Sequence, residues 1–301
     1  MTRIELGAIR KLRHAIGCIV TAARSRIGRW IDSHDRLITY YSRIIKTQPD
    51  WTCSICGSAS RFFVFMRGVK YFRCSKCHLV QSSYYRGKDL YLNVYKDKVQ
   101  TTSERGGGRE LFFVEWGSRL LNLDNPRILI FAPASTPTFK ILSERGADVY
   151  AADISDGLPY SDRFIHLRKD KLPDIEFDII TMVEIIEHFD NPVGEFRTLS
   201  KHLAPNGIIA GATDFYQGGA IWNNIYLFPK DHISYFHHDS LSYLCDLLGL
   251  KCVLFEMEWS RKKKDIRNRR AFVIYRENSI VARDAIYGYR QTCSILPIKH
   301  G

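Results

Sequence analysis

The 301-residue sequence lacks any apolar run near the length of about 18 residues that a membrane-spanning helix needs, so we expect no transmembrane span. Cysteine is also sparse. Of the eight cysteines, Cys18, Cys245, Cys252 and Cys293 stand singly. Single scattered cysteines in a chain with α/β patterns are typical of a reducing compartment and argue against a small secreted domain built on disulfides. We therefore expect a cytoplasmic protein.

Acidic residues are scarce in two stretches, and these account for the net charge of +12. Residues 1–46 carry ten Lys and Arg against three acids, and residues 261–270 carry seven against one. The rest of the chain is balanced, with 27 basic and 28 acidic residues. The basicity is therefore local, and each basic segment needs its own explanation.

Residues 1–49 are predicted to form a basic amphipathic helical segment. Apolar residues recur there at helical spacing: Ile9, Leu12, Ile16, Ile19, Val20, Ala23, Ile27 and Trp30. Such a helix can make peripheral contact with an anionic membrane or a polyanion, or act as a targeting peptide. It can equally dock its apolar stripe on the rest of the chain and leave its arginines in solvent. The sequence leaves these uses open.

Two Cys-x-x-Cys pairs give the sharpest local motif. They are Cys53 with Cys56 and Cys74 with Cys77, and seventeen residues separate the pairs. This spacing is typical of a four-cysteine Zn²⁺ site with no ligand position left for water, which predicts a structural metal. The apolar runs at 62–65 and 69–72 predict a hairpin between the pairs, so residues 50–82 are interpreted as a zinc ribbon. Disulfides at these cysteines are the alternative, and nucleic-acid binding by the ribbon is weighed against a scaffolding role.

The rest of the chain predicts an α/β domain. Residues 83–123 are expected to be a connector with a helix, and residues 279–301 a C-terminal tail. Between them, apolar runs rich in β-branched residues predict strands at 128–131, 148–153, 164–167, 177–183, 208–212, 252–257 and 271–275. Helical patterns separate the early strands, so residues 124–278 are predicted to form a Rossmann-like, seven-stranded, mostly parallel sheet.

Polar residues follow two of these strands. The run Ile179–Val183 is followed directly by Glu184, Glu187 and His188. Open α/β sheets bind ligands at the carboxyl ends of their strands, so these side chains are candidates for a site. Asp153 ends the second strand about twenty residues after the first, where an acid can hold ribose hydroxyls. A helix-capping role is the alternative for Asp153.

With these motifs, the chain resembles the class I S-adenosylmethionine-dependent methyltransferases that carry a zinc-ribbon head. The resemblance covers residues 124–276. It rests on Phe177-Asp-Ile-Ile-Thr followed by Glu184 and Glu187-His188, then Asn191-Pro192, Leu203-Ala-Pro-Asn-Gly207 and Asp231-His-Ile-Ser-Tyr-Phe236. It implies methyl transfer from S-adenosylmethionine to an oxygen, nitrogen or carbon nucleophile.

The resemblance also implies roles for individual residues. Asp153 would bind the ribose, Asp170 would border the adenine, Ala132, Ala134 and Ser135 would face the methionyl group, and Glu184 would complete the cofactor site. His188 and His232 are the candidate bases, because each is expected on a loop at the ligand edge and an imidazole can titrate near neutral pH. A helix-capping role for His188 and simple packing for His232 are the alternatives. The turn Phe131-Ala-Pro-Ala-Ser-Thr-Pro137 has no glycine where the family has a glycine-rich turn. A cofactor-free relative that acts as a binding or scaffold module is therefore an alternative.

The second basic segment, residues 261–270, joins the last two predicted strands. If the penultimate strand is parallel to the others, this segment leaves the sheet at the ligand edge. We therefore expect an anionic small-molecule or glycan acceptor, such as a sugar nucleotide or a phosphorylated glycan or lipid. An RNA acceptor is the alternative, favoured by the two basic segments and the ribbon.

Overall fold

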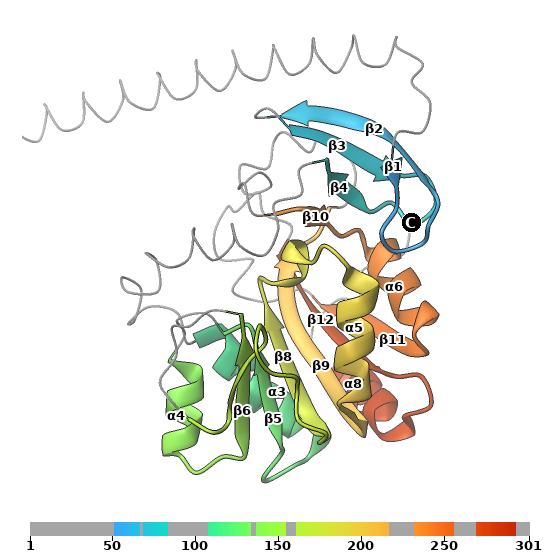
Figure 1. The fold of residues 1–301 in the computed structure, drawn as a ribbon. Coiled ribbons are helices and arrows are strands. Elements are labelled where there is room, and N and C mark those ends of the chain that lie inside the picture. Colours follow the sequence, from blue (N-terminus) through green and yellow to red (C-terminus); the bar gives the residue numbers. More distant parts are fainter. Residues whose placement is uncertain are drawn as a thin grey trace, which may run out of the picture.

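The computed structural model describes residues 51–66, 69–83, 108–133, 137–154, 161–216, 232–255 and 269–292 (Figure 1). The predicted helical segment 1–49 and positions 261–268 lie outside these ranges, as do Ala134 and Ser135. None of the described helices has the length and hydropathy needed to cross a membrane.

A seven-stranded sheet forms the larger part of the described structure. Its strands are β5 (Ile128–Phe131), β6 (Val149–Asp153), β7 (Phe164–His166), β8 (Phe177–Val183), β9 (Leu203–Asp214), β11 (Leu250–Phe255) and β12 (Arg269–Arg276). Their order is β11-β12-β9-β8-β5-β6-β7. Strand β12 is antiparallel to both of its neighbours, and every other pair is parallel, so β11 runs in the same direction as β9. This confirms the predicted Rossmann-like, mostly parallel α/β sheet.

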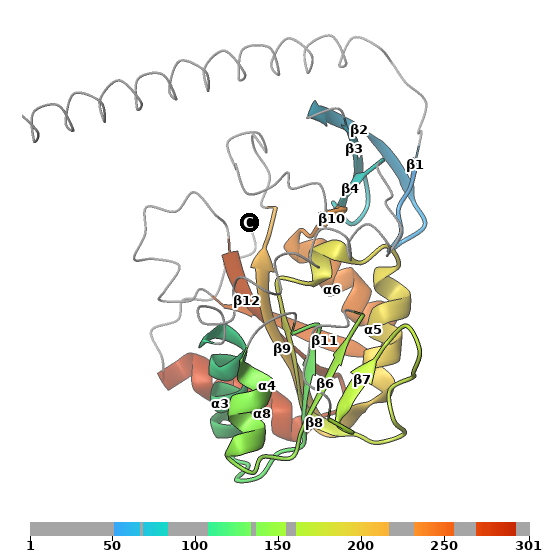
Figure 2. The ribbon, with the colours of Figure 1, turned by 60° about the vertical axis from the view of Figure 1, so that its left-hand side comes forward.

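Helices cover both faces of this sheet (Figure 2). Helices α3 (Gly108–Leu121), α4 (Thr138–Glu144) and α8 (Ile280–Thr292) pack on one face, and α5 (Pro192–Lys201) and α6 (His238–Leu247) pack on the other. Strand β5 is apolar throughout because both of its faces are buried. Ile128 and Ile130 pack in the core on one side of the sheet, and Leu129 and Phe131 pack in the core on the other side. Helix α3 lies in the stretch expected as a connector, and α8 in the stretch expected as a tail.

In the unit β8-α5-β9, the residues before and after the helix have different roles. The Asn191 side chain accepts a hydrogen bond from the Gly194 N–H, and Pro192 stands in the first turn. Residues 204–207, expected as a stop before the next strand, lie instead within β9. The close approach of β8 explains the glycine there, since a Cβ on Gly207 would lie 2.8 Å from the Phe177 carbonyl oxygen.

A second, antiparallel sheet contains the predicted hairpin. Its strands are β1 (Trp51–Thr52), β2 (Ala59–Met66), β3 (Val69–Cys74), β4 (Val80–Ser82) and β10 (Ser234–Tyr235), in that order. Strands β2 and β3 confirm the hairpin. Strand β10 comes from the far side of the α/β sequence and was not predicted. It places this sheet over the carboxyl ends of β8 and β9 (Figure 1).

Candidate active site

The ends of three neighbouring strands define the ligand edge of the larger sheet. Phe131 of β5 is in register with Ala152 of β6 and Met182 of β8. The next residues along these strands, Ala132 and Asp153 among them, therefore lie at one level of the edge. The register brings together two of the predicted cofactor residues, and Glu184 follows β8 one position further on.

Backbone strain is concentrated at this edge. Ala132 has a φ of +53° and Glu184 has a φ of +54°, in the left-handed region that non-glycine residues seldom occupy. Ala132 therefore occupies a glycine-type conformation without being a glycine, and its N–H donates to the Ala152 carbonyl at 2.7 Å. The Glu184 N–H donates in the same way to the Ala212 carbonyl at 2.8 Å. These bonds to neighbouring strands hold the two strained residues in place.

The other two acids predicted for the cofactor differ in their surroundings. Asp153 ends β6 and is 3% exposed. Asp170 follows β7 and is exposed, with its N–H donating to the His166 carbonyl at 2.8 Å. The structure thus places Asp153 inside the edge and Asp170 on its outer side.

Arg109 of α3 reaches the same edge. Its Nη1 lies 3.1 Å from Oε1 of Glu184, whose side chain is largely buried. The sequence reasoning did not identify Arg109, because no local pattern distinguishes one arginine at a helix start from another. The contact ties α3 to the end of β8.

Glu187 is a second buried acid of the site. It lies in the short 3₁₀ helix η1 (Ile186–His188), and its side chain is 4% exposed. Its Oε2 accepts a hydrogen bond from the Thr213 hydroxyl at 2.8 Å, whereas its Oε1 has no hydrogen-bond partner among the described residues. Burial, together with the nearby Glu184 carboxylate, raises the pKa of Glu187 well above its ordinary value. The sequence placed Glu187 at this edge but gave it no role.

The two candidate bases, His188 and His232, lie side by side next to Glu187. Their rings meet edge to face with centroids 4.7 Å apart. Nε2 of His232 lies 3.9 Å from Oε1 of Glu187, and a ligand atom from each of the three side chains lies within 4.8 Å of the others. Two histidines separated by 43 intervening positions in the sequence therefore form one cluster with a buried carboxylate.

Backbone hydrogen bonds hold the His232 segment against η1 and against the smaller sheet. The Ile233 N–H donates to the Glu187 carbonyl at 3.0 Å, and the Ser82 N–H of β4 donates to the Ile233 carbonyl at 2.9 Å. The Ser234 hydroxyl adds a bond to the Phe189 carbonyl. Hydrogen bonds to β4 of the smaller sheet and to η1 at the ligand edge thus fix the position of the segment that carries His232.

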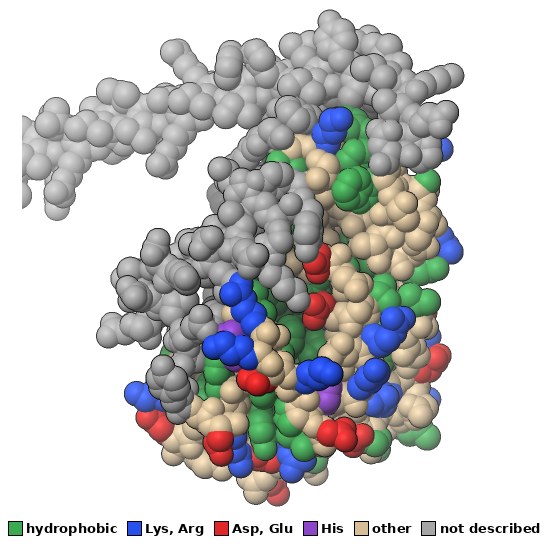
Figure 3. All heavy atoms as spheres, viewed as in Figure 1, with side chains coloured by type: hydrophobic (Ala, Val, Ile, Leu, Met, Phe, Trp, Pro, Cys, Tyr) green, Lys and Arg blue, Asp and Glu red, His purple; other side chains and the backbone are tan. Residues whose placement is uncertain are grey.

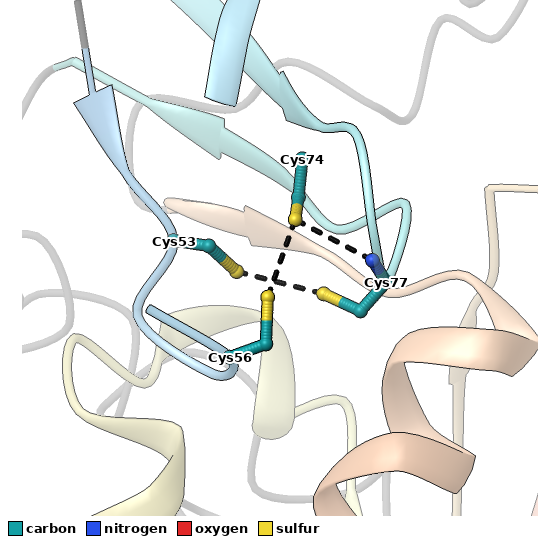
Figure 4. A group of neighbouring side chains, drawn as sticks. All are labelled: Cys53, Cys56, Cys74 and Cys77. Carbon is teal, nitrogen blue, oxygen red and sulfur yellow. Dashed lines mark hydrogen bonds between the residues drawn. The ribbon is translucent and has the colours of Figure 1, made fainter. Parts of the chain in front are cut away.

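The four predicted metal ligands, Cys53, Cys56, Cys74 and Cys77, converge at one end of the smaller sheet (Figure 4). The Sγ atoms of Cys53 and Cys77 are 3.5 Å apart, and those of Cys56 and Cys74 are 3.4 Å apart. Four sulfurs around Zn²⁺ at about 2.3 Å would be separated by roughly 3.8 Å, so the cluster fits this ion. The contact with the Cys77 thiol lowers the pKa of Cys53 to about 5, which favours a thiolate there.

The backbone of the two Cys pairs also fits a metal site. The N–H groups of Lys76 and Cys77 point to Sγ of Cys74 at 3.3 and 3.4 Å. Gly57 follows the first pair with a φ of +67°, and His78 occupies the corresponding position after the second pair with a φ of +63°.

His78 links the ribbon to α6. Its Nδ1 lies 2.9 Å from Oδ2 of Asp239, which also lies 3.2 Å from Nδ1 of His237. His237 caps α6, and its burial lowers its pKa to about 4. This second cluster of two histidines and a carboxylate is therefore already held by hydrogen bonds that orient the ribbon on the domain.

Comparison with protein families and solved structures gives one family match. Residues 106–254 match the family model described as a methyltransferase domain. No curated protein matches the chain.

Two similar solved structures have methyltransferase names. An S-adenosylmethionine-dependent methyltransferase from Clostridium acetobutylicum is 11% identical, covers 62% of this chain and 98% of its own, and has a TM-score of 0.44. The 1,6-didemethyltoxoflavin-N1-methyltransferase of Burkholderia thailandensis, solved with 1,6-didemethyltoxoflavin and S-adenosylhomocysteine, is 12% identical, covers 72% and 100%, and has a TM-score of 0.45.

The family match spans α3 and the sheet as far as β11, together with the ligand edge described above. The resemblance inferred from residues 124–276 and the family match therefore overlap at residues 124–254. Residues 106–254, which include most of the seven-stranded sheet, are thus similar to a methyltransferase domain.

Proposed function

We propose that this enzyme transfers the methyl group of S-adenosylmethionine to an anionic small-molecule or glycan acceptor at the edge formed by β5, β6 and β8. The observation that carries the proposal is the cluster of the buried Glu187 and His232 with the half-buried His188, beside the strand ends that would hold the cofactor.

The cofactor would lie across the ends of β5 and β6. Asp153, at the end of β6, would accept hydrogen bonds from the ribose hydroxyls, and Ala132 would face the methionyl part. Asp170 would border the adenine from the outer side, and Glu184 would close the site. Ala134 and Ser135 complete this set as residues of the same turn. Bound there, the cofactor supplies a methyl group on a positively charged sulfur.

An imidazole of the cluster would take the acceptor's proton. The cofactor would supply the methyl group and keep the electron pair of the carbon–sulfur bond, and the acceptor's proton would pass to a nitrogen of His188 or His232. A positioned base of this kind accelerates a transfer by about 10²- to 10⁴-fold. Glu187 acts as a positioning residue next to both rings.

The acceptor's negative charge is proposed from the second basic segment. Strand β11 ends at Phe255 and β12 begins at Arg269, which pairs with Asp214 at the carboxyl end of β9. The segment that joins these strands therefore starts and ends at the edge that carries the site. Arg269 and the lysines at 262–264 belong to it.

The described surface favours a small acceptor over RNA. Lys and Arg side chains on the face of Figure 3 are spread over several elements and interrupted by Asp and Glu, so the described part of that face has no single basic track. Contacts of residues 1–49 with a membrane or a polyanion remain a prediction about a segment outside the described ranges.

We also propose that the four cysteines hold a structural Zn²⁺. The two short sulfur pairs and the N–H groups directed at Cys74 support this assignment. Four thiolates leave no position for water, so the ion would stabilise the ribbon and take no part in methyl transfer.

Titration calorimetry with S-adenosylmethionine tests the cofactor site first. We expect micromolar binding that Asp153→Ala weakens at least tenfold, because two ribose hydrogen bonds are lost at about 1 kcal/mol or more each. Asp178→Ala is a suitable control, since Asp178 bonds the Arg127 N–H near the opposite end of β8. Binding that Asp153→Ala leaves intact would contradict the site, and a radiolabelled methyl group that enters only RNA would contradict the acceptor class.

A further inference from the structure

The cluster of Glu187, His188 and His232 has a feature that proton transfer alone does not explain. Oε1 of Glu187 is fully buried and has no hydrogen-bond partner among the described residues. A buried carboxylate oxygen without a hydrogen-bond partner is unfavourable. Nε2 of His232 lies 3.9 Å from this oxygen, which is too far for a hydrogen bond.

The separation suits two ligands of one ion. Divalent metals bind carboxylate oxygen and imidazole nitrogen at about 2.1 Å, so two such ligands lie about 3 Å apart when adjacent and about 4.2 Å apart when opposite. The 3.9 Å separation falls inside this range, and the ligand atoms of all three side chains lie within 4.8 Å of one another.

The local charge also favours a cation. Glu184 and Asp214 both act electrostatically on Glu187 and disfavour its charged form. Glu184 has an ion pair with Arg109, which offsets part of this negative charge. A divalent cation would relieve the remaining repulsion, since opposite charge stabilises buried carboxylates.

The cluster is rigid enough to bind an ion without large rearrangement. The Thr213 hydroxyl fixes the other oxygen of Glu187 at 2.8 Å. The Ile233 N–H bond to the Glu187 carbonyl fixes the His232 segment against the segment that carries the other two ligands. Hydrogen bonds of this kind, made by the ligands themselves, orient metal ligands in proteins.

We propose that Glu187, His188 and His232 form a binding site for one divalent transition-metal ion, distinct from the four-cysteine site. One carboxylate and two imidazoles suit Mn²⁺, Fe²⁺, Co²⁺ or Zn²⁺, and three protein ligands leave coordination positions open. The inference rests on the proposed function only for its expectation that the acceptor approaches this edge, where an open position would hold an acceptor oxygen. With the ion bound, both imidazoles would act as ligands, so the proton-accepting role proposed above for His188 or His232 would apply only to the protein without this ion.

Electron paramagnetic resonance with Mn²⁺ tests the proposal on the full chain that carries one equivalent of zinc, which the four cysteines bind before the histidines do. Thiolates prefer zinc to manganese, so the four cysteines do not compete for the probe. We expect one Mn²⁺ per chain, with ¹⁴N coupling from directly bound imidazole. Glu187→Gln and His232→Ala should each weaken binding at least tenfold.

Two single-histidine variants serve as matched controls. His202→Ala removes a half-buried imidazole that bonds the Ile175 carbonyl at the opposite edge of the sheet, and His78→Ala removes one from the other histidine–carboxylate cluster. Both should leave Mn²⁺ affinity unchanged. Loss of binding in His78→Ala, with Glu187→Gln unaffected, would assign the ion to that other cluster and overturn the proposal.

If a variant fails to fold, Mn²⁺ binding to the wild-type protein still tests the proposal. Absence of Mn²⁺ binding at millimolar concentration, or binding without ¹⁴N coupling, overturns the inference. Calorimetry with S-adenosylmethionine on the same samples separates the two hypotheses. Cofactor binding without Mn²⁺ binding leaves the proposed function standing, and Mn²⁺ binding without cofactor binding leaves only the metal site.

Discussion

Ala132 shows how a single Cβ atom bears on the cofactor site. Its φ of +53° lies in a region that costs a non-glycine residue about 1–2 kcal/mol. Glycine adopts the same conformation without this cost but loses about 0.5–1 kcal/mol through its freer unfolded chain. The balance favours glycine slightly, so alanine at position 132 lowers the stability of this turn by a small amount.

We therefore expect Ala132→Gly to raise the free energy of unfolding by about 0.5–1 kcal/mol, measured by urea denaturation. Ala152→Gly is the matched control, because Ala152 lies within β6 and has an ordinary strand conformation. That change should lower the stability by about 1 kcal/mol. Destabilisation by both substitutions to a similar extent would show that the strain at position 132 is negligible.

Glu110 gives a prediction about pH. It lies in the first turn of α3 and is 8% exposed, and burial raises its pKa to about 7 from an ordinary 4.5. The folded state thus keeps this proton up to about pH 7, whereas the unfolded chain loses it near pH 4.5, so the stability contribution of this group falls as the pH rises between these values.

Replacing Glu110 with Gln removes the ionisable group and should raise the free energy of unfolding by about 2 kcal/mol at pH 8, with almost no effect below pH 4.5. Denaturant titrations at several pH values measure this difference. Glu115→Gln, on the exposed side of the same helix and paired with Arg145, should show a flat difference across the range. A gain for Glu110→Gln that does not depend on pH would contradict the assignment.

At the scale of elements, the sequence predicted the parts that depend on local patterns. All seven strands of the α/β sheet, the hairpin and the Asn191 cap follow from hydrophobic periodicity and capping residues. Strand β10 could not be found in this way. Ser234–Tyr235 is a two-residue strand whose partner, β4, lies more than 150 residues away in the sequence, so only the packed fold defines the pairing.

The start of β9 illustrates a second limit. Ala204-Pro-Asn-Gly207 has the composition of a turn, and its proline and glycine are typical helix stops. In the structure, pairing with β8 extends the strand back to Leu203, with an irregularity in the register between Phe177 and Ile179. Tertiary pairing thus overrides local turn propensity there.

The pairing of β8 with β9 depends on Gly211. A Cβ at this position would overlap the Met182 carbonyl oxygen and lie 2.8 Å from the Phe272 ring. Gly211→Ala should therefore separate β8 from β9 and lower the free energy of unfolding by more than about 3 kcal/mol, as measured by denaturant titration. Gly288→Ala in α8 is the control, since a Cβ there meets no atom within 4 Å. A neutral Gly211→Ala would contradict the tight packing of the two strands.

At the scale of the whole molecule, the candidate site combines segments that are distant in the sequence. His188 and His232 were each predicted as a base, but their contact with one another and with Glu187 follows only from β10 joining the ribbon sheet. Arg109 reaches Glu184 because α3 packs across the sheet. Sequence patterns identify residues with the right chemistry, and long-range packing decides which of them meet.

The smaller sheet contacts the segment that carries His232, so removal of the metal from the cysteines should also affect the candidate site. The Ser82 N–H bond to the Ile233 carbonyl lies between the cysteine cluster and His232, whereas Ala132 and Asp153 depend on the larger sheet. We expect zinc chelation to abolish hydrogen-exchange protection at Ile233 while the amides of β5 and β6 stay protected.

Binding of S-adenosylmethionine should change less than about twofold in the zinc-free protein, because the strand ends that would hold it remain paired. Mass spectrometry of exchanged peptides measures the protection, and readdition of Zn²⁺ should restore it. Protection of Ile233 that persists without zinc would show that η1 alone holds the His232 segment, through the bond from the Ile233 N–H to the Glu187 carbonyl. Restoration by Zn²⁺ would instead show that the smaller sheet is required to place His232, the proposed base.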